Sequence, residues 1–114
     1  MADKPDQEKL NQLQIFEQNM QQVSSQKQKY QAQMMELENA LSELEKEKEK
    51  VYKIAGEIMF LTESEDVKKD LNSKKEIIGL RIKNLEKQET NIREKVQKLQ
   101  EEIMKEMNKN KKNE

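Results

Sequence analysis

Charged side chains are the main candidates for chemistry in this sequence. It has 23 Asp and Glu residues and 22 Lys and Arg residues among 114, but no histidine and no cysteine. The chain thus lacks the commonest general base and metal ligand, and also the thiol nucleophile. Carboxylates recur four residues from lysines, a spacing that stabilises helices, and no phosphate-binding loop or metal-ligand spacing appears. The sequence therefore predicts no enzyme, no catalytic residue, no metal site and no cofactor.

The distribution of charge also argues against two classes of partner. The net charge is −1 and both signs are mixed along the chain, so we expect neither nucleic-acid nor membrane binding. The lysines at 109, 111 and 112 are interpreted as part of a frayed tail. No apolar run reaches the roughly 18 residues that a membrane span needs. The polar start Met1–Leu10 and the absence of cysteine favour a cytoplasmic location.

The composition indicates long helices in place of a compact globule. Charged residues make up 39% of the chain and hydrophobic residues only 32%, with two glycines and one proline. Glu, Lys, Gln, Leu and Met dominate, and these residues lose little rotamer freedom in a helix. High charge with few aromatic residues is also typical of disorder, so the periodicity of the apolar residues must decide.

Two heptad runs decide in favour of helices. In the first, the d positions are apolar over six repeats, which is typical of a coiled-coil seam. These positions are Phe16, Val23, Tyr30, Leu37, Leu44 and Val51, and the a positions include Leu13, Met20, Met34 and Leu41. The second run has d positions Leu71, Ile78, Leu85, Ile92 and Leu99, with a positions Ile82, Val96 and Ile103. Thr62, Ser64, Glu65 and Asp66 before it resemble a helix start.

The two runs are of similar length, about 40 residues or roughly 60 Å each, which favours an antiparallel pair. A charge interrupts each a series, Lys27 in the first run and Glu89 in the second. Folding the chain back near residue 58 brings these charges into adjacent layers, where they would partly offset each other and specify the register. The alternative is that each side chain extends separately to water.

The segment between the runs differs from both. Residues 51–61 (VYKIAGEIMFL) are rich in β-branched and aromatic residues, with Gly56 at a possible tight turn. We expect two short strands on which Tyr52, Ile54, Ile58 and Phe60 share one face. A lone hairpin is marginally stable and has free edges, so it predicts oligomerisation. A local hydrophobic plug between the helix ends is the alternative.

Motifs in this segment carry a family resemblance. Val51-Tyr52-Lys53 with Gly56, followed by the apolar stretch Ile58–Leu61, resembles the β-type subunits of prefoldin, and Leu85-Glu86-Lys87-Gln88-Glu89 is similar to a stretch of their second helix. One departure is Glu45–Lys50, where many members have an acidic, often proline-containing linker. Because Glu and Lys favour helix, we expect the first helix to run on to about residue 50.

The resemblance implies a fold and a function. The expected fold is mostly α: residues 1–114 form a single domain, a long antiparallel two-helix coiled coil joined by one short β-hairpin through which it oligomerises. The expected boundaries are 6–50 for the first helix, 51–61 for the hairpin, 64–107 for the second helix and 108–114 for the frayed tail. The implied function is that of an ATP-independent chaperone subunit in a hexamer of two α-type and four β-type subunits. Such a hexamer holds unfolded client proteins at the coiled-coil tips and passes them to a group II chaperonin.

The same resemblance assigns candidate residues. Assembly is expected to depend on the hairpin residues Val51, Tyr52, Ile54, Gly56, Ile58 and Phe60. Client binding is expected at Leu10, Leu13, Ile15, Phe16, Met20, Leu99, Ile103, Met104 and Met107. Ile77 and Leu80, off the seam near the bend, would pack under the hairpin or against a neighbour.

Two alternatives stand beside these assignments. The client-binding residues could be only seam ends and scattered surface residues. The whole chain could be a structural or tethering coiled coil, which needs the heptads alone and predicts no activity toward unfolded proteins.

Overall fold

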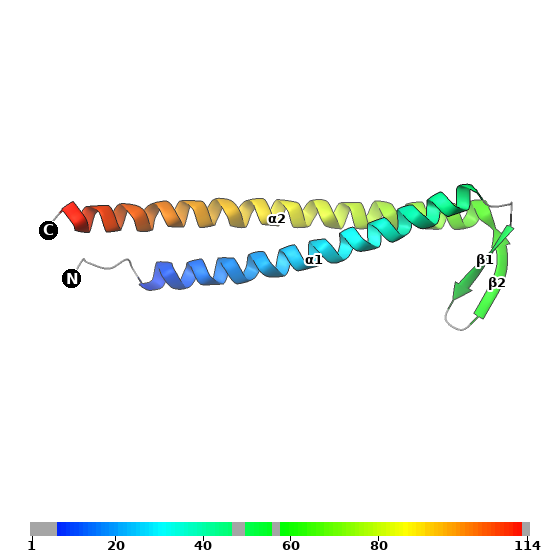
Figure 1. Cartoon of the computed structure of the whole chain (residues 1–114), viewed down its shortest axis with the longest axis horizontal. Helices are drawn as coiled ribbons and strands as arrows, with labels where there is room; N and C mark the ends of the chain where they lie inside the picture. Colours follow the sequence, from blue (N-terminus) through cyan, green and yellow to red (C-terminus); the bar gives the residue numbers. More distant parts are fainter. Residues whose placement is uncertain (1–6, 47–49, 56–57, 113–114) are drawn as a thin grey trace. The chain divides into compact units, whose positions relative to one another are not determined.

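The chain consists of two long helices with a β-hairpin between them. The computed structural model describes residues 7–46, 50–55 and 58–112, and contains α1 (Gln7–Glu45), β1 (Lys50–Ala55), β2 (Ile58–Glu63) and α2 (Ser64–Lys112), in that order (Figure 1). The helices contain 39 and 49 residues. The predicted fold class, long antiparallel helices joined by a short hairpin, is confirmed.

The first helix ends earlier than the sequence predicts. α1 stops at Glu45, and the backbone N–H of Lys46 donates to the Glu43 carbonyl at 3.1 Å, a tighter turn than an α-helix makes. Lys50, which was expected to end the helix, is already extended and paired with Glu63 in the hairpin. Pairing in the sheet therefore overrides the helix propensity of Lys50.

The second helix begins directly where the hairpin ends. β2 continues to Glu63 and α2 starts at Ser64, a buried residue, with Glu65 and Asp66 in the first turn where acids suit the helix dipole. α2 continues to Lys112, beyond the expected end at residue 107. The added residues include no proline or glycine, which would disfavour a helix.

The hairpin is a two-stranded antiparallel sheet with an unambiguous register. Tyr52 pairs with Leu61, Ile54 with Met59 and Ala55 with Ile58. Every pair therefore joins an even-numbered residue to an odd-numbered one. Directly paired residues project to the same face of a sheet, so this parity decides which side chains lie together.

The chain divides into two compact units that each contain parts of both helices. The terminal unit is Met1–Lys27 with Asn84–Glu114, and the hairpin unit is Gln28–Lys83. In each unit the helix segments are antiparallel. Lys9 of α1 contacts Glu102 near the end of α2 in the terminal unit, and Glu38 contacts Lys75 at 3.8 Å in the hairpin unit.

The buried apolar residues in the described part of the chain are few, as expected for paired helices. They are Val23, Leu85, Leu99 and Ile103, all in the terminal unit. Two helices bury only a narrow seam, so much of each remaining apolar side chain stays accessible. Among the described residues, no helix has a stretch apolar and long enough to cross a membrane.

Candidate functional site

The outer face of the hairpin is an exposed apolar surface. Tyr52, Ile54, Met59 and Leu61 share this face by register, and between 53% and 70% of each residue is exposed. An isolated sheet face with four large apolar side chains is an unusual concentration for a soluble surface. We call these four residues the hairpin face.

The prediction that Tyr52 and Ile54 share a face with Ile58 and Phe60 is wrong. The register pairs Ile58 with Ala55 and Phe60 with Lys53. Both residues therefore belong to the face of the sheet that does not carry Tyr52 and Ile54. The physical reason is the pairing of Ala55 with Ile58, which shifts the second strand by one residue relative to the expected alignment. Such a shift moves every side chain of that strand to the other face.

The opposite face of the hairpin contacts α2 through Lys53. The ammonium group of Lys53 lies 3.8 Å from a carboxylate oxygen of Asp70, and Val51 and Thr62 are half-buried. Asp70 also lies 3.6 Å from Lys74, one helical turn further along. The two faces thus differ, since one is partly covered within the chain and the hairpin face is open.

The predicted assembly residues are therefore divided. Tyr52 and Ile54 lie on the hairpin face, Val51 lies on the opposite face, and Gly56 lies outside the described residues. For Ile58 and Phe60 the structure describes the strand backbone only. Sequence reasoning omitted Met59 and Leu61, which the register places on the hairpin face. Assuming a two-residue connection between the strands would have identified Met59 and Leu61, because such a connection pairs each odd-numbered residue with an even-numbered one.

The predicted client-binding residues fall into two groups in the terminal unit. Leu99 and Ile103 are buried, at 6% and 9% exposed, whereas Ile15, Met104 and Met107 are at least half exposed. Half-buried positions account for the remaining members, Leu10, Leu13, Phe16 and Met20. Only Ile15, Met104 and Met107 are thus presented openly on the folded surface, and contact with Leu99 or Ile103 would require the helices to separate.

The two charges that interrupt the seam form an ion pair. The ammonium group of Lys27 donates to a carboxylate oxygen of Glu89 at 2.8 Å, and the Glu89 side chain is only 13% exposed. The predicted contact between these residues is confirmed, and the alternative in which each extends separately to water is not observed. Since the pair joins α1 to α2, it favours the observed register.

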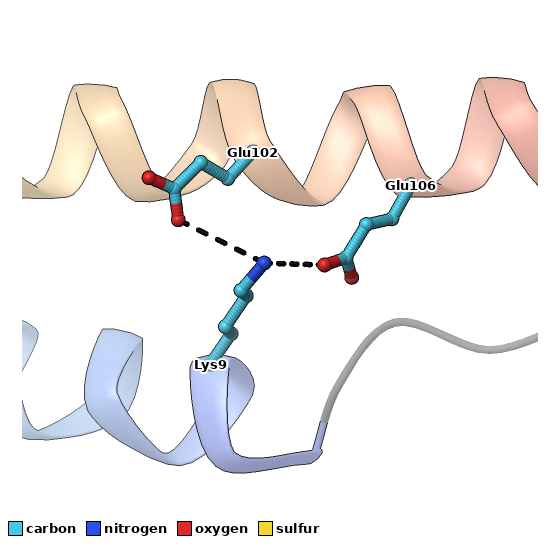
Figure 2. Close-up of polar contacts among 3 residues, drawn as sticks. All are labelled: Lys9, Glu102 and Glu106. Atoms are coloured by element: carbon cyan, nitrogen blue, oxygen red, sulfur yellow. Dashed lines mark hydrogen bonds and ion pairs between the residues drawn. The ribbon is translucent and has the colours of Figure 1, made fainter.

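A second ion cluster joins the start of α1 to the last turns of α2. Lys9 forms an ion pair with Glu106, and its ammonium group lies 3.8 Å from a carboxylate oxygen of Glu102 (Figure 2). The Lys9 side chain is only 26% exposed. This cluster was not predicted from the sequence. Extending each heptad run by one repeat would have indicated it, because Lys9 lies seven residues before Phe16 and Glu106 seven residues after Leu99. Lys9 and Glu106 therefore both occupy d positions.

The hairpin unit has further exposed apolar residues on its helices. Met35, Ile77 and Leu80 are each more than half exposed, so the hairpin does not cover Ile77 or Leu80. Ile77 also lines a shallow groove of about 470 Å³ with Leu37, Ile78 and polar neighbours. The alternative prediction, that Ile77 and Leu80 pack against a neighbouring subunit, stays a prediction.

Comparison with known proteins identifies the family. The sequence profile of the prefoldin subunit family matches residues 7–110. The chain belongs to the prefoldin family. The prefoldin subunit beta of Pyrobaculum islandicum is 35% identical over 103 residues, which cover 89% of this chain and 82% of that protein. That of Archaeoglobus fulgidus is 38% identical over 94 residues, 81% of each chain.

A solved prefoldin structure has the same fold. The crystal structure of the prefoldin beta subunit from Thermococcus strain KS-1 matches with a TM-score of 0.88 at 32% identity, covering 94% of this chain and 97% of that one. The resemblance inferred from Val51-Tyr52-Lys53 and Gly56 is thus confirmed. The chain is a prefoldin subunit, and its broad functional class is that of a chaperone subunit.

Proposed function

We propose that this chain is the β-type subunit of an ATP-independent holdase that binds non-native polypeptides through its terminal unit and passes them to a group II chaperonin. The observation that carries the proposal is an exposed apolar surface on each unit. The hairpin face supplies one, and Ile15, Met104 and Met107 supply the other. A coiled coil needs neither for its own folding, so both surfaces are available for partners.

Assembly is the proposed role of the hairpin face. A two-stranded sheet is marginally stable alone and has unpaired edges, and here it also carries exposed Tyr52, Ile54, Met59 and Leu61. Hairpins of sister subunits would satisfy both needs, because their strands would extend the sheet and their apolar faces would cover one another. The proposed assembly is a hexamer of two α-type and four β-type subunits.

Client binding is the proposed role of the terminal unit. Methionine is flexible and polarisable, so exposed Met104 and Met107 suit contact with clients of many sequences. Fully burying one such side chain contributes about 1.5–3 kcal/mol. One terminal unit would therefore bind weakly, and several in one assembly would gain affinity through multivalency. Weak individual contacts allow the client to be released. The proposed location of the assembly is the cytoplasm.

The test is suppression of aggregation. The full chain is assembled with an α-type prefoldin subunit, and aggregation of a chemically denatured test protein is followed by light scattering without nucleotide. We expect suppression near a one-to-one ratio of hexamer to client, and transfer of the client when a group II chaperonin is added. A hexamer that leaves aggregation unchanged would favour the alternative, a structural coiled coil without chaperone activity.

A further inference from the structure

The exposed apolar surface of the terminal unit consists mainly of methionine. Among the described residues of this unit, three large apolar residues are at least half exposed. Two of them are Met104 at 62% and Met107 at 50%, and the third is Ile15. Met104 and Met107 lie three residues apart on α2, a spacing that places both side chains on one side of the helix. We call these two residues the methionine pair.

The methionine pair can react with a peroxide without help from a neighbouring base. A thioether sulfur has no proton to lose, so it attacks one oxygen of hydrogen peroxide directly. The S–O bond forms as the O–O bond breaks, the sulfur is oxidised by two electrons, and the second oxygen leaves as water with both protons. Because the chain contains no cysteine, methionine is its only sulfur-containing side chain that a peroxide can oxidise.

The other described methionines each lack one property of the methionine pair. Met20 and Met34 are half-buried, so a peroxide reaches their sulfur less easily. Met35 and Met59 are similarly exposed, at 63% and 61%, but both belong to the hairpin unit. Met59 also lies on the hairpin face, which the proposed assembly covers. In an assembled protein the methionine pair thus combines free access for a peroxide with a place on the client-binding surface.

Oxidation reverses the property that suits the methionine pair to client contact. A sulfoxide is polar and accepts hydrogen bonds, so burying it against an apolar client costs free energy where the thioether contributed it. Two of the three exposed apolar residues change in this way, and only Ile15 stays apolar. Because several weak contacts hold a client at once, a weaker contact at every terminal unit multiplies into a large loss of affinity.

We propose that the methionine pair is a site of reversible oxidation by hydroperoxides, and that its conversion to sulfoxide makes the protein release its client. The inference rests on the proposed function and adds its regulation by an oxidant. Reduction restores the thioether, because a methionine sulfoxide reductase supplies two electrons from a thiol reductant and two protons, and the oxygen leaves as water. Client holding then follows the peroxide level, and no nucleotide is involved.

The test oxidises the assembled protein and follows client binding. The hexamer formed with an α-type subunit is treated with hydrogen peroxide until peptide mass mapping shows sulfoxide at residues 104 and 107, and catalase then removes the peroxide. We expect the affinity for a labelled denatured protein to fall by on the order of tenfold, while the mass of the hexamer stays the same. Treatment with methionine sulfoxide reductases, which act on both sulfoxide epimers, should restore the affinity.

Two variants assign the effect to the methionine pair. Each is compared with itself before and after peroxide, so any effect of the substitution on affinity cancels. In Met104→Leu with Met107→Leu, no sulfur remains at the pair, and the affinity should change by less than about twofold. Met35→Leu removes a methionine of nearly equal exposure from the hairpin unit, and this variant should lose affinity as the parent does.

Several results would overturn the inference. One is a parent hexamer that keeps its affinity although both residues are oxidised, and another is a double leucine variant that loses as much affinity as the parent. A loss that the reductases do not reverse, or that accompanies dissociation of the hexamer, would also count against it. If the untreated parent hexamer binds no denatured protein at all, the proposed function itself fails, a result that is seen before any peroxide is added.

Discussion

The hairpin face leads to a sharp prediction about assembly, because the chain contains a matched control residue. Met59 lies on the hairpin face and is 61% exposed, whereas Met35 lies on α1 and is 63% exposed. Changing either to Asp removes the same side chain and adds the same charge. The two variants therefore differ only in where the change is made.

The expected magnitude follows from the exposed area. Complete burial of a large apolar side chain contributes about 1.5–3 kcal/mol, so covering the exposed parts of four such residues contributes about 4–8 kcal/mol per hairpin. Met59 accounts for about 1–2 kcal/mol of this. An aspartate in a covered apolar surface adds a desolvation penalty of about 1–3 kcal/mol or more. Together the loss is about 3 kcal/mol, or roughly a hundredfold weaker association.

The assay is the mass of the complex formed with an α-type subunit, measured by native mass spectrometry or light scattering at micromolar concentration. Met59→Asp should shift the mass toward free subunits, while Met35→Asp should assemble like the parent. Circular dichroism should show equal helicity for all three proteins, because neither residue is buried. The reasoning would be refuted if Met59→Asp assembled normally, or if Met35→Asp impaired assembly to the same extent.

Three further predictions concern stability and client binding. Gly79→Ala should raise the melting temperature, because alanine stabilises a helix interior by about 0.5–1 kcal/mol relative to glycine. The added methyl group would make an ordinary van der Waals contact, 3.7 Å from the nearest side-chain atom. Lys27→Ala should lower the free energy of unfolding by about 1–2 kcal/mol, measured by urea denaturation, because the mostly buried Glu89 carboxylate loses its cation. Met104→Ser should weaken the suppression of aggregation, whereas Met35→Ser, at nearly equal exposure, should not.

Each of these has a contradicting result. A lower melting temperature for the alanine variant would mean that the helices at Gly79 approach more closely than observed. Unchanged stability after Lys27→Ala would mean that Glu89 finds water as readily as its partner. Equal effects of the two serine variants on the suppression of aggregation would mean that the terminal unit has no specific role in client binding.

The helices and their seam were predictable because they depend on local periodicity. The apolar d positions from Phe16 onward indicate the helices, and the two interruptions at Lys27 and Glu89 indicate which residues meet. Antiparallel pairing of similar lengths was then enough to predict the ion pair that the structure contains. The prediction of this ion pair does not require an exact register, because long charged side chains reach across one helical turn.

The faces of the hairpin were not predictable to the same degree. Whether Ile54 lies with Phe60 or with Met59 depends on whether the connection has an odd or an even number of residues, and composition alone does not determine it. The end of α1 was also missed, since Glu and Lys residues favour helix locally and only pairing across the hairpin makes Lys50 extended. The cluster at Lys9 does not follow from the apolar heptads, because its members are charged residues at seam positions.

The odd-to-even pairing across the hairpin restricts how this gene can evolve. Deleting or inserting a single codon between β1 and β2 would invert one strand, sending Met59 and Leu61 inward and their neighbours outward. Changes of two codons would preserve the pattern. Among descendants of this sequence, length variation at the bend should therefore occur in steps of two, even where substitutions are freely accepted.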